Sequence, residues 1–425
     1  MLIDAATSHK PPVVRRDPFR CKIGVRNCNP KRSAHRFGLI KCGGFLNPLQ
    51  KLQRTDDENV RRPAPCTRAL PQSGTPAALF AGLHVDQMIY VGIGVAPILF
   101  GIWWIRRFLK ADADLHLLSC PPPEKDFFDG KVVWITGASQ GFGKKLAQYF
   151  SKHGAKLILS SRKKEQLEKA ASSCQGKFRG ETVILPFDLT AGPVALADVA
   201  KIALSSFDNA GPDYIIHNAG ASQHGLAHEA SPKIVDQMFQ LNTVGPITLT
   251  TALLPGLLEK GKGHFVAIAS MGAMTPAPGQ ALYSGCKFGL RGYFLALRSE
   301  MADSPLRFSV CCPGPLASSP DGSDPPRVVF GSNGLISEKI ETGAGGKRLE
   351  PDRAIELIAT AMRNNLAECW IAKHPVLFIG YLFQFFPSLG WWLMERYGPS
   401  RARQMKTGEG YSMKKLLFGK KNKAL

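Results

Sequence analysis

The sequence predicts an α/β fold, a doubly wound parallel sheet with helices on both faces. Three observations lead to this prediction. The middle of the chain alternates short apolar runs with helical patterns, the runs are continuously apolar, and a glycine-rich turn follows the first of them. Continuous apolar strands are typical of a parallel sheet that is buried on both faces. Right-handed crossovers then give the doubly wound arrangement, and we expect one such domain over residues 126–372.

Six apolar runs have strand character. They lie at 131–137, 155–161, 182–188, 213–220, 263–270 and 307–314. Helical patterns follow most of them, at 144–154, 163–173, 194–207, 231–260 and 283–301. Residues 315–350 are rich in Gly, Pro and Ser, which predicts a long loop. Loops of this length in compact domains are usually functional or disordered.

Composition and charge exclude several classes of protein. Of 425 residues, 44% are hydrophobic and 20% charged, which is ordinary for a chain with a buried core and excludes whole-chain disorder. No repeat period occurs. The net charge of +21 is concentrated at the ends, with +9 in residues 1–87 and +8 in 396–425. A folded domain with a basic nucleic-acid-binding face is therefore not predicted.

The ten cysteines form no recognisable framework. They include no CxxC pair and lack the spacing of a zinc site or of a secreted disulfide scaffold. We therefore expect buried or free thiols and no metal site.

Residues 1–87 are rich in Pro, Arg and Asn and show no sustained apolar period. They fit a disordered arm, an organelle transit peptide, or a leader that precedes a physiological start at Met88. Transit peptides are poor in acidic residues, so the acidic cluster at 56–58 counts against that alternative.

An uncharged run at 88–105 predicts a transmembrane anchor over residues 88–110. Eighteen helical residues span about 27 Å, close to the thickness of a bilayer core. Trp103 and Trp104 are followed by Arg106, Arg107 and Lys110, as at a membrane interface, and the basic side indicates a cytosolic catalytic part. A core helix and a cleaved signal peptide are the alternatives.

A second apolar segment, 374–394, contains many aromatic residues and no Lys, Arg, Asp or Glu. Pro375 and Pro387 interrupt it, so two short helices at a membrane interface are favoured over a second span. The alternative is a hydrophobic subunit interface, as in a homodimer. We assign 373–395 as a membrane-associated extension and 396–425 as a basic tail, which fits either an anionic membrane surface or a solvated segment.

The chemistry begins at the glycine-rich turn 136–143, which follows a strand and precedes a helix. Gly137, Gly141 and Gly143 permit a tight turn and close approach of a pyrophosphate to the helix N-terminus. After the second strand Arg162 follows Ser161, where an NAD site usually carries an acidic residue. The cationic fork of Arg162 favours a 2′-phosphate, and therefore NADP(H) rather than NAD(H).

Tyr283 and Lys287 are four residues apart in a predicted helix, so they share one face. A neighbouring ammonium group stabilises a phenolate and lowers the pKa of the phenol toward working pH. This pair is suited to acid–base chemistry.

Together these motifs resemble the short-chain dehydrogenase/reductases over residues 129–315. The catalytic set of that family corresponds to Asn242, Ser270, Tyr283 and Lys287, with its spacings of 28, 13 and 4. The resemblance implies a Rossmann fold, a nicotinamide cofactor and hydride transfer. Two residues depart from the family pattern. Phe142 replaces the usual Ile and is expected to fill a helix core, and His217 replaces the first Asn of the family's Asn-Asn-Ala-Gly turn and is expected only to satisfy turn hydrogen bonds.

The resemblance also implies the cofactor site. Asp188 corresponds to the adenine-contacting position, and Pro313 and Gly314 to the turn beside the nicotinamide. The loop 315–350 does not obviously match the family, and we expect it from its length and composition to be the substrate loop. The implied cofactor-binding residues are Gly137, Ser139, Gln140, Gly141, Phe142, Gly143, Ser161, Arg162, Asp188, Leu189, Asn218, Ala219, Gly220, Tyr283, Lys287, Pro313 and Gly314.

We therefore expect an NADP(H)-dependent oxidoreductase that interconverts a lipophilic carbonyl and alcohol, of steroid, retinoid or other lipid type. The expected partners are this substrate and membrane lipids, with no nucleic acid and with a possible homodimer. The expected location is the endoplasmic reticulum membrane, or a plastid or other organelle membrane if 1–87 is a transit peptide. The alternative functions are a 3-ketosphinganine reductase and a non-catalytic dinucleotide-binding scaffold.

Overall fold

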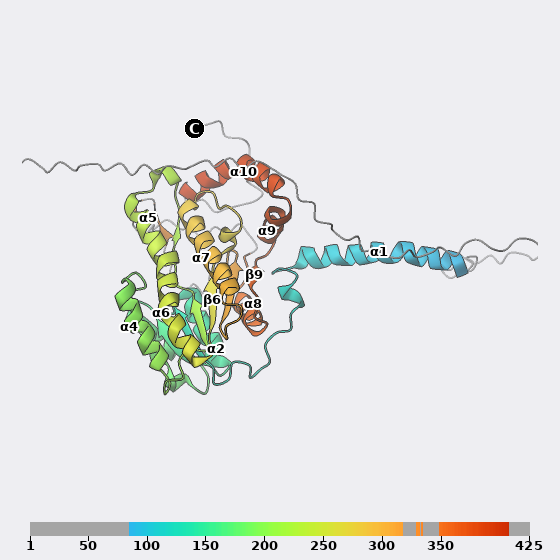
Figure 1. The fold of residues 1–425 in the computed structure, drawn as a ribbon. Helices are drawn as coiled ribbons and strands as arrows, with labels where there is room; N and C mark the ends of the chain where they lie inside the picture. Colours follow the sequence, from blue (N-terminus) through green and yellow to red (C-terminus); the bar gives the residue numbers. More distant parts are fainter. Residues whose placement is uncertain (1–84, 318–328, 332, 335–347, 408–425) are drawn as a thin grey trace, which may run out of the picture. The chain divides into compact units, whose positions relative to one another are not determined.

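The computed structural model describes residues 85–317, 329–331, 333–334 and 348–407, with side chains left out at 85–94, 179 and 406–407 (Figure 1). The predictions for 1–84 and 408–425 lie outside the described residues, as do those for most of the loop 315–350.

The centre of the fold is a seven-stranded parallel sheet, which confirms the predicted doubly wound α/β fold. The strand order is β3-β2-β1-β4-β6-β7-β9. The strands are β1 (Val132–Thr136), β2 (Lys156–Ser160), β3 (Val183–Ile184), β4 (Tyr214–His217), β6 (His264–Ile268), β7 (Arg307–Pro313) and β9 (Glu368–Ile371). The first six lie where the sequence predicts strands, and β9 is an edge strand that the sequence analysis does not include.

Helices cover both faces of the sheet (Figure 1). Each strand sends alternate side chains to the two cores. In β1, Val133 and Ile135 enter one core, and Val132 and Trp134 enter the other. Double-sided burial explains why the strands are continuously apolar. The first core is covered by α2 (Gly141–Lys152), α3 (Lys164–Ser172) and α8 (Pro351–Arg363), and the second by α4 (Pro193–Ser205), α6 (Gly245–Lys260) and α7 (Ala281–Glu300).

One described run, Pro232–Lys260, is long and apolar enough to cross a membrane by length and composition. It comprises α5 (Pro232–Phe239), a five-residue π-helical turn η5 (Gln240–Val244) and α6. Leu249, Leu253 and Leu257 of α6 are fully buried against the sheet. We therefore assign this run to the core of the domain.

The predicted anchor forms a helix, α1 (Val85–Lys110), which contains Pro97. Most of its described apolar side chains are exposed; Ile98, Phe100 and Leu109 each expose about 60% of their surface, whereas Phe108 is half-buried. That α1 spans a membrane is part of the proposal below.

The segment after α1 belongs to the fold rather than to a free linker. Asp114 pairs with the edge strand β9, donating its N–H to Trp370 O (2.8 Å) and accepting the Trp370 N–H at Oδ2 (2.7 Å). Its Oδ1 accepts the Leu117 N–H (2.8 Å), and Ala113 and Leu117 are buried in the first core. These contacts lie N-terminal to residue 126, where the sequence pattern places the start of the domain.

The apolar segment near the C-terminus forms two helices, α9 (Val376–Phe385) and α10 (Pro387–Thr407). Pro375 precedes α9 and Pro387 begins α10, as expected of a residue that is tolerated at a helix start and breaks a helix interior. Helix α10 continues to Thr407, so the first part of the predicted basic tail is helical. The end of α1 contacts α9 where the Phe108 ring lies 5.4 Å from that of Tyr381.

We expect Asp114→Ala to lower the free energy of unfolding by about 2–3 kcal/mol, because it removes a charged acceptor from two backbone N–H groups. Asp112→Ala is the matched control, since Asp112 makes an ion pair with the half-exposed Arg353 (3.0 Å), which is worth at most about 1 kcal/mol. Urea unfolding of both variants measures the difference. Equal losses would contradict the structural role of Asp114.

Candidate active site

Most of the predicted site residues follow the carboxyl ends of the strands β1, β2, β3, β4, β6 and β7, and the others lie on η5 and α7. The strand order reverses between β1 and β4, the neighbours from which the sheet is wound in opposite directions. In open parallel sheets, ligands bind in the crevice at this point. The turns that follow Thr136, His217, Ile268 and Pro313 therefore line one edge of the sheet.

Two glycines of the glycine-rich turn, Gly137 and Gly143, are packed too closely for side chains. Gly137 has a φ of +68°, and a Cβ there would lie 2.8 Å from the Ala219 Cα. A Cβ at Gly143 would collide with the Gly137 carbonyl oxygen and lie 2.6 Å from Asn218 Nδ2. Gly141, with a φ of +54°, has open space where its Cβ would be. The backbone at the start of α2 is thus accessible to a ligand, as a pyrophosphate site requires. Ser139, Gln140 and Phe142 complete the turn, and Phe142 packs against the first core, as expected of its position.

Asn218 joins the turn after β4 to the turn after β1. Its Nδ2 donates to the carbonyl oxygens of Thr136 (3.0 Å) and Gly137 (3.2 Å). The Thr136 Oγ1 in turn accepts the N–H groups of Asn218 (3.1 Å) and Ala219 (3.2 Å). Thr136 is absent from the predicted site residues, although it is the first residue of the glycine-rich motif.

The ends of β2 and β3 carry the next predicted residues. Ser161 Oγ is buried and has no hydrogen-bond partner among the described residues, and the Arg162 side chain is exposed. Asp188 Oδ1 accepts the Thr190 N–H (2.9 Å) and hydroxyl (2.8 Å), which fixes the turn after β3. The buried Leu189 follows, and a Cβ at Gly245 would lie 2.5 Å from its carbonyl oxygen.

Ser270 and Tyr283 converge on Gly272. A Cβ built on Gly272 would lie 3.4 Å from Ser270 Oγ, 3.7 Å from Tyr283 Cε1 and 3.8 Å from Ser284 Oγ. Ser270 caps the short helix η6 (Met271–Ala273), and its Oγ accepts the Gly272 N–H (3.0 Å). Ser270, in the turn after β6, and Tyr283, on α7, thus meet at the sheet edge.

Lys287 lies behind Tyr283 and is buried. Its Nζ is 5.9 Å from the centre of the Tyr283 ring and donates to the Ile268 carbonyl oxygen (2.9 Å). Burial lowers the pKa of this lysine from its ordinary value to about 8. The ammonium group therefore remains mostly charged at neutral pH, although it lies in the protein interior.

Asn242 lies on the π-helical turn η5, between α5 and α6. Such turns occur frequently at functional sites. Its Oδ1 accepts the Ala221 N–H (3.2 Å), and its Nδ2 donates to the Met238 carbonyl oxygen (3.0 Å). A Cβ on Gly220 would lie 2.7 Å from Asn242 Oδ1 and 3.5 Å from Lys287 Nζ. The structure therefore brings Asn242, Lys287 and the turn after β4 together.

His217 occupies a place different from the expected one. It ends β4, and its side chain points into the core rather than bonding within the turn: Nε2 lies 2.8 Å from Thr250 Oγ1 of α6. The Thr250 hydroxyl donates its proton to the Pro246 carbonyl oxygen. Its oxygen therefore accepts from the His217 Nε2–H. Burial lowers the pKa of His217 to about 3, which keeps the imidazole neutral. The turn's hydrogen bonds are made by Asn218 instead.

Pro313 and Gly314 end β7 beside β9. The Gly314 N–H donates to the Ile371 carbonyl oxygen (2.8 Å), and a Cβ at Gly314 would lie 2.8 Å from the Ala372 Cβ. The edge strand β9 therefore fixes the turn that the sequence places beside the nicotinamide.

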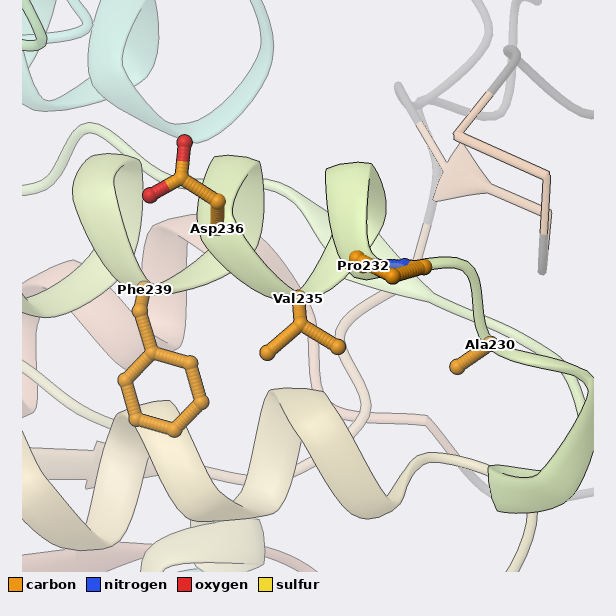
Figure 2. Close-up of a pocket in the computed structure, with 5 residues that line it drawn as sticks. All are labelled: Ala230, Pro232, Val235, Asp236 and Phe239. Carbon is orange, nitrogen blue, oxygen red and sulfur yellow. The ribbon is translucent and has the colours of Figure 1, made fainter. Parts of the chain in front are cut away.

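A surface hollow lies along α5 (Figure 2). It is lined by Ala230, Pro232, Val235, Asp236 and Phe239, none of which belongs to the predicted site. In the described part of the chain, no group of three or more His, Cys, Asp or Glu side chains could hold a metal ion.

Comparison with known proteins defines the class. The family profile described as short chain dehydrogenase matches residues 131–324. A solved short-chain dehydrogenase from Streptomyces avermitilis shares the fold, with a TM-score of 0.52 and 23% identity over 64% of this chain and 98% of that one. Together with the relatives below, these findings place the chain in the short-chain dehydrogenase/reductase family, and it is an oxidoreductase.

Within the family, the chain is similar to dehydrogenase/reductase SDR family member 7. It is 34% identical to the human protein over 317 residues, which cover 72% of this chain and 89% of that one. The mouse protein of the same name is 33% identical over 310 residues, covering 71% of this chain and 89% of its own length. The shared region is longer than the family profile match, so the likeness includes sequence outside 131–324.

Proposed function

We propose that the protein is a membrane-associated, NADP(H)-dependent oxidoreductase that interconverts a lipophilic carbonyl and alcohol. The observation that carries this proposal is the convergence of Ser270 and Tyr283 on Gly272, with the buried Lys287 behind the tyrosine ring. This arrangement offers a hydroxyl to orient a carbonyl oxygen, a phenol to protonate it and an ammonium group to stabilise the phenolate.

The residues present fit a phosphorylated dinucleotide. The side-chain-free cradle at Gly137, Gly141 and Gly143 supports pyrophosphate binding at the start of α2. The buried Ser161 hydroxyl, which has no hydrogen-bond partner among the described residues, and the exposed guanidinium of Arg162 would supply a donor and a cation for a 2′-phosphate. The other predicted contacts, Asp188, Asn218 and the turn at 313–314, lie at the same sheet edge.

Proton transfer is the step that the chain's own residues would perform, while the bound nicotinamide would supply hydride. Ser270 Oγ would hold the substrate oxygen, and the Tyr283 hydroxyl would donate the proton to it. Lys287 would keep the resulting phenolate stabilised, and Asn242 would hold a water molecule of the proton relay. In alcohol oxidation each transfer runs in reverse.

The surface of the C-terminal helices supports a lipophilic substrate and a membrane partner. Phe385, Phe386, Leu389, Trp391 and Trp392 expose about half or more of their surface around the junction of α9 and α10. We call these five residues the aromatic patch. Exposed aromatic residues next to basic sequence are suited to a bilayer interface. We propose that α1 anchors the protein in a membrane, most simply that of the endoplasmic reticulum, and that the aromatic patch lies on the surface of the same membrane. Cell fractionation tests which organelle contains the protein.

One assay distinguishes the proposed function from the two alternatives, a 3-ketosphinganine reductase and a non-catalytic dinucleotide-binding scaffold. Purified protein is incubated with NADPH and a panel of steroid, retinoid and other lipid carbonyls that includes 3-ketosphinganine. Turnover of 3-ketosphinganine alone would favour the specific reductase. Tight NADPH binding without turnover of any member would favour a non-catalytic scaffold and contradict the proposal.

Tyr283→Phe is expected to lower kcat at least about 100-fold while leaving the affinity for NADPH nearly unchanged, because only the proton donor is removed. Tyr293→Phe is the matched control, since it removes a phenol from the same helix. Stopped-flow turnover and nucleotide titration measure both quantities. Near-normal turnover by the Tyr283 variant would refute the mechanism.

Arg162→Ala is expected to weaken NADPH binding by about 10- to 100-fold and NADH binding by much less, because only NADPH carries the 2′-phosphate. Lys169→Ala removes an exposed cation from α3 and controls for the change in net charge. Fluorescence titration with both nucleotides gives the ratio. Equal losses for NADPH and NADH would contradict the assignment.

A truncated protein that begins at Ala111 is expected to lose the behaviour of an integral membrane protein but to bind anionic vesicles at low salt. This start removes α1 and keeps Asp114. High salt should release the protein only in part, because screening weakens the charge contacts and not the apolar ones. Replacing Trp391 and Trp392 with Ser should abolish the remaining binding. Absence of vesicle binding together with concentration-dependent dimerisation would identify the patch as a subunit interface.

A further inference from the structure

The loop Pro278–Gln280 precedes α7 and lies between β5 and the C-terminal helix α10. On one side the Gly279 carbonyl oxygen accepts the Gly225 N–H (3.0 Å), just after β5 (Ser222–Gln223). On the other side a Cβ at Gly279 would lie 2.8 Å from Met405 Cβ and 3.2 Å from Ala402 Cα of α10. Gly279 also has a φ of +82°, so this approach requires glycine.

Arg401 of α10 joins the two elements by its guanidinium fork. One nitrogen, Nη1, donates to the Pro278 carbonyl oxygen, and the other, Nη2, donates to Gln280 Oε1 (3.1 Å). The Gln280 Nε2 donates onward to Ser222 Oγ of β5 (2.8 Å). A chain of three side chains therefore runs from the C-terminal helix through the loop to β5.

The loop determines where the first turn of α7 begins. Gln280 is the residue that precedes α7, and its carbonyl oxygen accepts the Ser284 N–H (2.9 Å). Tyr283 lies within that first turn, three residues after Gln280. The first N–H groups of a helix have no partner within the helix, so its first turn is held by what precedes it. A shift of Pro278–Gln280 would therefore move the Tyr283 hydroxyl.

Helix α9, which precedes α10, contacts the turn that carries Ser270. A Cβ at Gly380 of α9 would lie 2.6 Å from Met271 Cε, and Met271 follows Ser270. The C-terminal pair of helices thus contacts the segments that carry both Ser270 and Tyr283. The glycine-rich turn and the catalytic set of the family do not by themselves assign this role to the C-terminal helices.

We propose that Arg401 is a positioning residue, which holds the loop Pro278–Gln280 against α10 and so fixes Tyr283 relative to the substrate oxygen. The proposal rests on the proposed function, in which Tyr283 is the proton donor. It makes α10 part of the catalytic assembly as well as of the membrane-associated surface.

The test measures Arg401→Ala in detergent solution, without vesicles, so that lipid contacts do not enter. We expect kcat to fall on the order of tenfold, because small misplacements of a catalytic group cost one to two orders of magnitude. The affinity for NADPH should not change. Arg401→Lys keeps the charge but loses the two-pronged fork, and should lie between the wild type and Arg401→Ala. Arg396→Ala, an exposed arginine on the same helix, should match the wild type.

Two further measurements separate positioning from a general loss of stability. Millimolar guanidinium ion should restore part of the turnover of Arg401→Ala and none of that of Tyr283→Phe. Hydrogen exchange of the backbone at 279–284 should accelerate in Arg401→Ala and not in Arg396→Ala. An Arg401→Ala protein with wild-type kcat and wild-type exchange would overturn the proposal. If Tyr283→Phe also turned over normally, the proposed function itself would fail.

Discussion

The contact between the turns after β1 and β4 is the constraint on which the site depends. The Gly137 backbone lies so close to Ala219 that no side chain fits between them, and the Thr136 hydroxyl accepts two N–H groups of the opposite turn. These two turns border the point at which the strand order reverses. The glycine-rich turn proposed for pyrophosphate begins at one of these turns, and Ala221, whose N–H holds Asn242 Oδ1, follows the other. A shift between β1 and β4 would therefore displace both halves of the proposed site.

The second constraint is a charge held inside the protein. Lys287 is buried, with a pKa lowered to about 8, and its Nζ donates to a backbone carbonyl oxygen of β6. Burial of an ammonium group is unfavourable unless it is hydrogen-bonded or paired. Packing alone therefore does not explain a lysine at this position. A buried lysine next to a tyrosine at a sheet edge is typical of a functional site.

The fold could be predicted wherever the signal was local. The alternation of apolar runs and helices places six of the seven strands, and the proline positions place the break between α9 and α10. Strand β9 (Glu368–Ile371) was missed because it is an edge strand that is buried only at alternate residues and begins with Glu368, so it forms no continuous apolar run. Helix α8 was missed because it follows the long loop rather than an apolar run. The spacing predicts the candidate catalytic residues, but it does not predict that Ser270 and Tyr283 converge on Gly272.

Long-range contacts account for the rest of what the sequence does not reveal. Whether His217 faces the turn or the core depends on Thr250, thirty-three residues away. Arg401 and Gln280 are separated by 121 residues, and no local pattern distinguishes this arginine from the other cations of the C-terminal segment. Side-chain direction and pairing across such separations are determined by the packed structure rather than by periodicity.

The pairing of Asp114 with Trp370 has a consequence for variation in chain length. Helix α1 ends at Lys110, so only three residues separate it from the edge of the sheet. Because the connection is so short, it also limits the rotation of α1 relative to the sheet. An insertion between Lys110 and Asp114 would leave the end of α1 held to the domain by its contact with α9 alone. Relatives with longer or shorter chains should therefore accommodate the difference elsewhere, and conserve the number of residues at this junction more strictly than their identity.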